Sequence, residues 1–340
     1  MELRPLGASG LDVTPLCLGT MMFGAWGATT EPDCTRILHA ALDAGITTVD
    51  VADIYAFGEA EEFVGRALRG RRDGVVLATK FGNPMSDDPA RRGASRRWMH
   101  EAVEDSLRRL GTDWIDLYQV HRPDPDTDVD ETLAALGELV DEGKIRAFGT
   151  STFPASALVE AAWVAERNGR RPFTAEQPPY SIFTRRIEAE VLPVCQRLGL
   201  GVLVWAPLNG GWLTGKYRRA VAVPADARGI REAEHFDLGS VAAEEKLSVV
   251  EALLALAADH GLTLPQLALA FVLAHPAVTT AIIGPRTLDQ LESVLGADAV
   301  RLDPEVLDRI DELVAPGGDV NPADAGYVPP PLTDPALRRR

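Results

Sequence analysis

Eight short apolar runs recur along the chain, and longer segments with helical spacing separate them. The runs are rich in Val, Ile, Leu and aromatic residues, which favours buried strands. They are Pro15–Gly19, Thr47–Val49, Gly74–Thr79, Ile115–Val120, Ile145–Gly149, Phe173–Glu176, Gly201–Trp205 and Val278–Ile283. Nearly continuously apolar strands that alternate with helices are typical of a parallel sheet covered by helices. Eight such units predict an α/β fold whose sheet closes into a (β/α)8 TIM barrel.

The intervening segments carry helix start and stop signals. In the first one, Thr30 can cap the N-terminus, Pro32 suits the first turn, Asp33 completes a T-x-x-D box and Gly45 follows the last turn. The same spacing predicts helices at Ala60–Leu68, Ser95–Leu110, Asp130–Glu142, Pro154–Asn168, Arg186–Leu198, Ala242–His260 and Thr287–Leu295, with an additional one at Leu262–Leu273.

An open doubly wound sheet is the main alternative to the barrel. Its usual sign is G-x-G-x-x-G after the first strand, whereas here Gly19 is followed by Thr-Met-Met-Phe-Gly. The length of 340 residues suits one barrel, so we expect a single domain over 1–340. Its additions would be a short hairpin at 3–14, a long polar loop at 208–240 after the seventh strand, and an extended, proline-containing tail at 315–340.

The composition limits the kinds of molecule that the chain is expected to bind. The formal net charge of −16 opposes binding to phosphate backbones or anionic lipid, so neither nucleic acid nor membrane is expected. The three cysteines follow no metal-binding or disulfide spacing. We therefore expect no metal, and a location in the reducing cytoplasm.

Polar residues stand where the predicted strands end. Asp50, Lys80 and His121 follow strands two, three and four, and Ser151, Gln177 and Trp205 occupy similar positions later in the chain. Taken singly, Asp50 could cap a helix, Lys80 could lie on the surface, His121 could be a loop histidine and Tyr55 a packed aromatic. Together they converge on the barrel mouth, where active sites of this fold lie.

The segments around these residues resemble the aldo-keto reductase family, from about Leu3 to about Val314. The motifs that carry the resemblance are Thr48-Val49-Asp50-Val51-Ala52-Asp53-Ile54-Tyr55, Ala78-Thr79-Lys80, Gln119-Val120-His121, Gly149-Thr150-Ser151, Trp205-Ala206-Pro207-Leu208, Gly211-Trp212-Leu213-Thr214-Gly215-Lys216 and Ile283-Gly284-Pro285-Arg286.

The resemblance implies reduction of an aldehyde or ketone. Tyr55 would be the general acid, Lys80 would stabilise its phenolate, Asp50 would orient Lys80, and His121 would orient the substrate oxygen. These residue types suit the chemistry, because a phenol with a pKa near 10 needs a nearby cation to release its proton readily.

The resemblance also implies a nicotinamide cofactor held across the barrel mouth. Trp205 would stack on the nicotinamide, and Ser151 and Gln177 would contact its carboxamide. Arg286 follows the eighth strand and opens the next helix, with Gln290 nearby, so that its guanidinium and the backbone N–H groups there could both bind a phosphate. This favours NADPH over NADH, although Arg286 could equally be a solvent-facing arginine. The remaining expected contacts are Gly19, Thr20, Met21, Thr152, Ala206, Pro207, Leu208, Gly210, Gly211, Lys216 and Gly284. The chain departs from the family at Thr152, where Asn is common, and at Ser293 and Val294, where Glu and Asn are common.

A substrate pocket of Met22, Phe23, Trp26 and Trp98 would suit an apolar carbonyl compound, although Phe23 could equally seal the barrel top. Two other functions stay open. The family resemblance extends to barrel proteins that serve ion channels as auxiliary subunits, so a cofactor-binding regulatory subunit with little turnover is one alternative. A hydrolase using Asp50 and Asp53 is the other, but it would leave Lys80 and Trp205 unexplained. The chain could act as a monomer or a homo-oligomer.

Overall fold

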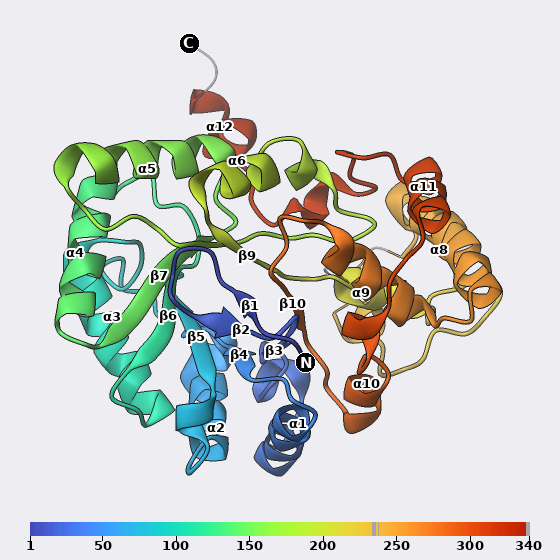
Figure 1. Cartoon of the computed structure of the whole chain (residues 1–340), viewed down its shortest axis with the longest axis horizontal. Coiled ribbons are helices and arrows are strands. Elements are labelled where there is room, and N and C mark those ends of the chain that lie inside the picture. Colours follow the sequence, from blue (N-terminus) through green and yellow to red (C-terminus); the bar gives the residue numbers. More distant parts are fainter. Residues whose placement is uncertain (233–235, 237, 338–340) are drawn as a thin grey trace.

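The barrel is closed, as the sequence predicts. A computed structural model describes residues 1–232, 236 and 238–337. Within these residues eight parallel strands close in the order β10-β3-β4-β5-β6-β7-β8-β9 (Figure 1). They are β3 (Leu16–Gly19), β4 (Thr48–Asp50), β5 (Val76–Phe81), β6 (Ile115–Val120), β7 (Ile145–Ser151), β8 (Ala175–Gln177), β9 (Gly201–Val204) and β10 (Thr280–Ile283).

The predicted N-terminal hairpin consists of β1 (Arg4–Pro5) and β2 (Asp12–Val13), which pair antiparallel. Its Leu6 and Val13 are fully buried against inward-facing strand residues such as Leu117 and Leu203. Gly7 must be glycine, because its φ is 54° and a Cβ there would lie 2.2 Å from the backbone nitrogen of Gly201. The hairpin therefore plugs the end of the barrel at which the strands begin.

Helices surround the barrel. They are α1 (Glu31–Asp43), α2 (Glu59–Ala67), α3 (Arg96–Leu110), α4 (Val129–Asp141), α5 (Ala155–Asn168), α6 (Val191–Leu198), α8 (Val241–Asp259), α9 (Leu264–Ala274), α10 (Leu288–Glu292) and α11 (Pro304–Leu313). Thr30 caps α1 by accepting from the Asp33 backbone, as predicted. The predicted helix at 186–198 is divided into η4 (Arg186–Glu188) and α6, and α11 has no counterpart among the predicted helices.

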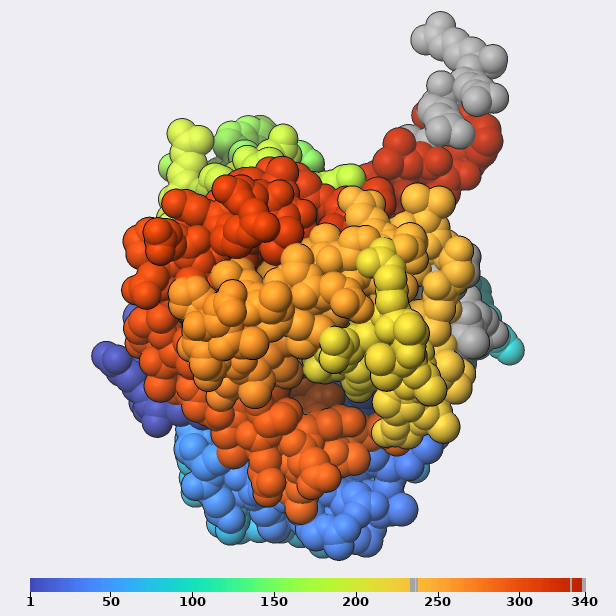
Figure 2. Space-filling view, turned by 90° about the vertical axis from the view of Figure 1, so that its right-hand side faces the viewer, coloured from blue at the N-terminus to red at the C-terminus, as the bar shows by residue number. Residues whose placement is uncertain are grey.

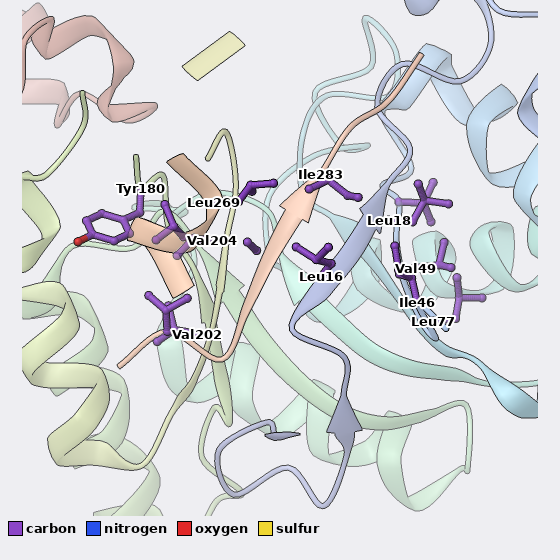
Figure 3. Packing of buried hydrophobic residues seen from close by; sticks show 14 of the residues in the cluster. Leu16, Leu18, Ile46, Val49, Leu77, Tyr180, Val202, Val204, Leu269 and Ile283 are labelled. Atoms are coloured by element: carbon purple, nitrogen blue, oxygen red, sulfur yellow. The ribbon is translucent and has the colours of Figure 1, made fainter. Parts of the chain in front are cut away.

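The main core lies between the strands and the helices. Leu16, Leu18, Val49, Val202 and Val204 are fully buried, and they point outward from the strands toward the helical layer (Figure 3). This packing follows from the nearly continuous apolar character of the strands, whose outer faces must be covered. It holds the strand ends, and thus the polar residues that follow them, in a rigid frame.

Two additions differ from the expectation. The loop after β9 contains the short helices η5 (Asn209–Thr214) and α7 (Arg228–Arg231). The tail is not extended, because η7 (Pro322–Ala325), α12 (Pro330–Thr333) and η8 (Pro335–Leu337) form helical turns in it. Proline is tolerated at the first positions of such turns, and it begins all three of them.

The tail divides into two parts. Its first part folds back onto the barrel, where the Val320 backbone donates to the Phe183 carbonyl at 2.9 Å. The red end of the described chain stands away from the body in Figure 2. No single helix of the described residues is long and apolar enough to cross a membrane, while α8 and α9 meet that test as a pair bent by 91°.

Candidate active site

Tyr55, Lys80 and Asp50 form one hydrogen-bonded group at the barrel mouth. Lys80 Nζ lies 2.6 Å from Asp50 Oδ2 and 3.3 Å from the Tyr55 hydroxyl, and it also donates to the Val51 carbonyl at 2.9 Å. The strand register brings them together, because Asp50 ends β4 and pairs with Ala78 of β5, two residues before Lys80. Tyr55 follows in the short helix η2 (Tyr55–Gly58).

The electrostatics of this group suit proton transfer. Burial alone would lower the pKa of Lys80, but the Asp50 carboxylate and the Tyr55 hydroxyl outweigh it and raise that pKa above its ordinary value. Lys80 therefore remains a cation. Burial raises the pKa of Tyr55, and the Lys80 ammonium acts against that rise. At neutral pH Tyr55 is thus a phenol with a fixed cation beside it.

His121 is buried beside Tyr55, and the two rings meet edge to face at 6.0 Å between centroids. Burial, reinforced by Lys80 and Arg122, holds the pKa of His121 well below its usual range. The imidazole is therefore neutral. Its Nδ1 lies 3.1 Å from the side-chain nitrogen of Asn83, an amide donor, so Nδ1 accepts and Nε2 carries the proton.

Gln177 has a role that the sequence did not predict. Its Nε2 donates to Asp50 Oδ1 at 2.9 Å and to Gln119 Oε1 at 3.3 Å. Both oxygens of Asp50 are thereby engaged, one by Lys80 and one by Gln177. Since this amide nitrogen is committed to the protein, Gln177 positions the carboxylate in addition to facing the cavity.

A cavity of about 500 Å³ opens at the mouth. Asp50, Tyr55 and His121 line it, and Lys80 lies behind Tyr55 and Asp50 without reaching it. Nearly all of the predicted cofactor residues line it as well: Gly19, Thr20, Met21, Ser151, Gln177, Trp205, Ala206, Pro207, Leu208, Gly210, Gly211, Lys216, Gly284, Arg286 and Gln290. Ser293 and Val294 complete that side.

The predicted substrate wall needs correction. Met22 and Trp26 line the cavity, and Trp26 contacts Tyr55 with 6.0 Å between ring centroids. Phe23 and Trp98, by contrast, are 0% and 1% exposed and belong to the core between strands and helices. Trp98 lies on the inner face of α3, which faces the barrel wall. The sequence places Phe23 and Trp98 near other site residues, but it does not show whether their side chains point into the cavity or into the core.

Trp205 is held at the cavity from two sides. Its Nε1 donates to Thr152 Oγ1 at 3.3 Å, so Thr152 supports the indole and is absent from the cavity lining, contrary to the predicted cofactor contact. Gly326 of the C-terminal tail covers the ring, because a Cβ there would lie 2.4 Å from Trp205 Cζ2. The ring is therefore fixed in position before any ligand binds.

The far side of the cavity is rich in cations, and its three arginines Arg228, Arg231 and Arg286 have carboxylate partners. Arg286 pairs with Asp226 at 2.7 Å, and its backbone nitrogen donates to Gln290 at 2.8 Å. The predicted helix after Arg286 begins only at Leu288 and is five residues long. Of the two groups expected to bind the phosphate, the Arg286 guanidinium lines the cavity. The Arg286 backbone N–H already donates to Gln290. Figure 2 shows the surface hollowed between the yellow loop after β9 and the orange segment after β10.

The sequence interpretation gave no site role to several charged or amide-bearing lining residues, among them Asn83, Arg122, Asp226, Arg228 and Arg231. Asn83 and Arg122 lie two residues past the ends of β5 and β6. Lys80 and His121 were identified as polar residues at the ends of predicted strands, and the same criterion could have included Asn83 and Arg122. Arg228 and Arg231 lie in the loop after β9, whose sequence has no periodic pattern to place them.

The fold and the site define a (β/α)8-barrel protein with an acid–base group at the carboxyl ends of its strands. Residues 15–315 match the sequence profile of the Aldo/keto reductase family. The chain belongs to this family, which makes it an oxidoreductase by relationship.

Several relatives are similar over most of their length. The chain is 40% identical to the uncharacterized oxidoreductase YrpG of Bacillus subtilis, over 96% of this chain and 100% of the relative. It is 37% identical to the aldo-keto reductase YhdN of the same organism, over 86% and 88%. It is also 36% identical to a probable voltage-gated potassium channel subunit beta of Oryza sativa, over 92% and 97%.

Proposed function

We propose that this protein is an NADPH-dependent reductase of aldehydes or ketones in which Tyr55 is the general acid. The observation that carries the proposal is the Lys80 ammonium 3.3 Å from the Tyr55 hydroxyl and 2.6 Å from Asp50. As Tyr55 gives its proton to the substrate oxygen, the fixed cation stabilises the developing phenolate. Neutral His121 supports the proposal, since its Nε2–H can donate to the same oxygen.

The cavity fits a nicotinamide cofactor. The Trp205 face, with Ser151 and Gln177 beside it, suits a flat ring carrying an amide. Gly210 and Gly211 have φ of 63° and 99°, so backbone without side chains can approach a pyrophosphate closely. Lys216 and Arg286 add positive charge at the far end. Bound NADPH would supply the hydride for the carbonyl carbon.

A steady-state assay with a panel of aromatic aldehydes tests the reaction. We expect Tyr55→Phe to lower kcat by about 10²- to 10⁴-fold, the usual contribution of general acid catalysis, with NADPH binding retained. Lack of NADPH oxidation by the wild-type protein with every carbonyl compound would refute the proposal.

The cofactor preference has its own test. Fluorescence titration should show tighter binding of NADPH than of NADH, and Arg286→Ala should abolish most of the difference because the guanidinium is the proposed phosphate contact. A preference that survives this substitution would exclude Arg286 as the phosphate contact.

The similarity to potassium channel β subunits supports a second candidate, a cofactor-binding regulatory subunit. Tight NADPH binding, negligible turnover and a stable partner in a pull-down would favour it. In either case we propose that the chain works as one barrel domain in the cytoplasm, since Cys17, Cys34 and Cys195 are free and buried and suit a reducing compartment.

A further inference from the structure

One arginine at the cavity differs from the others. Four arginines line the cavity, and three of them have a carboxylate within 4.0 Å. Arg228 pairs with Glu232 at 2.7 Å, Arg231 lies 3.9 Å from the same residue, and Arg286 pairs with Asp226. Arg122 has no carboxylate partner among the residues described in the structure. Its charge therefore faces the cavity uncompensated.

Arg122 is nevertheless held in place. Its Nη1 donates to the His121 carbonyl at 2.6 Å and to Ser151 Oγ at 3.4 Å. Its guanidinium carbon lies 6.0 Å from the centroid of the Trp205 ring. A guanidinium has five N–H donors, and within the described chain only Nη1 has a partner. Half-buried Arg122 thus presents its Nη2 and Nε donors with little freedom to rearrange.

The surroundings of Arg122 do not neutralise it. The acidic groups that influence Arg122 are the Tyr55 hydroxyl and buried Glu176. The Glu176 oxygens accept from the Phe153 backbone and the Thr150 hydroxyl, and neither oxygen bonds to Arg122. The other neighbours, His121, Ser151 and Trp205, are uncharged. On a chain with a net charge of −16, an unpaired guanidinium beside the acid–base group is a specific local attraction for an anion.

We propose that Arg122 forms an anion subsite which makes carbonyl compounds bearing a carboxylate the preferred substrates. The assignment rests on the proposed reductase function, because it takes the carbonyl oxygen to lie between Tyr55 and His121. Arg122 is the residue after His121, so a substrate with its oxygen on that histidine can place a second group on the guanidinium. An arginine–carboxylate contact is commonly bidentate, and two free donors on Nη2 and Nε are what such a contact requires.

Matched substrates test the proposal. The 2-, 3- and 4-carboxybenzaldehydes would be compared with their methyl esters, which keep the shape and remove the charge. In the wild type we expect kcat/KM for the best carboxylate isomer to exceed that for its ester by about 10- to 100-fold, the range for a hydrogen bond to a charged group. In Arg122→Gln the ratio should fall to near one while turnover of the ester persists.

Arg167→Gln is the matched control. Arg167 also lies over a tryptophan, 5.0 Å from the Trp163 ring, and it likewise has no carboxylate partner in the described chain, but it is exposed on α5. The substitution removes the same charge away from the cavity, so the carboxylate-to-ester ratio should not change. An equal change in both variants would show a general charge effect and overturn the subsite.

Two further outcomes would contradict the assignment. Equal loss of carboxylate and ester turnover in Arg122→Gln would mean that Arg122 only positions His121. A weaker affinity for NADPH with an unchanged ratio would mean that Arg122 contacts the cofactor.

A binding measurement separates this inference from the proposed reaction. Calorimetry with 2-, 3- and 4-(hydroxymethyl)benzoate and their methyl esters, with and without NADP⁺, requires no turnover. Tighter binding of one carboxylate than of its ester by the wild type, lost in Arg122→Gln, supports the subsite even if no aldehyde is reduced. Equal binding of carboxylates and esters by the wild type overturns the subsite even if aldehydes are reduced.

Discussion

The two ends of the cavity are built differently. We call the group Asp50, Tyr55, Lys80, His121 and Gln177 the strand end, because strand termini and the turns directly after them supply it. The loop end is formed by the loop after β9 and the segment after β10. Lys80 and Asp50 are 1% and 3% exposed in their side chains, whereas Arg286 and Asp226 are 17% and 65% exposed.

Under the proposed function, this difference separates two tasks. The strand end has its charges desolvated and its hydrogen bonds made before a ligand arrives, so the acid–base geometry needs no reorganisation. At the loop end the arginines pair with the chain's own carboxylates, and the Asp226 carboxylate is largely exposed to water. A ligand phosphate can replace such a pair at small free-energy cost, because exposed pairs contribute little.

The largest effect should follow from Lys80→Met. This change leaves the Asp50 carboxylate buried without its cation, which should lower the free energy of unfolding by about 3–5 kcal/mol and kcat/KM by about 10²- to 10⁴-fold. Urea unfolding and aldehyde reduction measure the two effects. Lys144→Met is the control, since Lys144 pairs with Glu104 and Glu142 at the surface and should contribute about 1 kcal/mol or less. Similar losses of stability and activity in Lys80→Met and Lys144→Met would contradict the proposed special role of buried Lys80.

Glu176→Gln tests whether burial next to the strand end, one residue before Gln177 in β8, makes stability depend on pH. Burial raises the pKa of Glu176 from 4.5 to about 7, so between these values the folded protein binds more protons than the unfolded chain, and stability falls as pH rises. We expect the variant to be more stable than the wild type by about 1–3 kcal/mol at pH 8 and nearly equal at pH 5. Urea unfolding at both pH values measures it. Exposed Glu166→Gln should give no such difference, and a pH-independent result for Glu176→Gln would refute the interpretation.

Gly326→Ala tests the tail that covers Trp205. Gly326 has a φ of 72°, and a Cβ added there would lie 2.4 Å from the Trp205 ring. Any side chain would strain both the backbone and this contact, so we expect a loss of about 1–3 kcal/mol and weaker NADPH binding. Gly317→Ala is the control, since Gly317 has a similar φ of 74° but no atom within 4 Å of an added Cβ. It should share the backbone strain and keep cofactor affinity. Equal NADPH dissociation constants for the two variants would show that the tail does not set the position of Trp205.

The smallest effect should come from Asp226→Asn at the loop end. Removal of an exposed partner should change the free energy of unfolding by about 1 kcal/mol or less. Because Arg286 then loses its competing carboxylate and keeps only neutral acceptors at residue 226, NADPH should bind about two- to fivefold more tightly, and NADH should not change. Fluorescence titration of both cofactors measures this. Weaker NADPH binding would indicate that Asp226 orders the site and does not compete for it.

Much of the strand end was accessible from the sequence. A buried parallel strand ends where its apolar run ends, and the residues just beyond must lie at one mouth of a closed barrel, so Asp50, Lys80 and His121 could be placed together from spacing and resemblance. The same reasoning did not find that Gln177 holds Asp50. A side-chain amide can bond to many different partners, and only the arrangement of the strands in the barrel brings Asp50 and Gln119 to Gln177.

The sequence by itself determined the alternation of eight strands with helices, the first helix with its Thr30 cap, and the order of polar residues at the strand ends. These features depend on local periodicity and on the chain direction. Only the tertiary structure decided that Phe23 and Trp98 point into the core, that Asp226 engages Arg286 across 60 residues of chain, and that Gly326 covers Trp205. Such contacts form between segments that are far apart in the sequence and come together only when the barrel closes. No local pattern in the sequence predicts them.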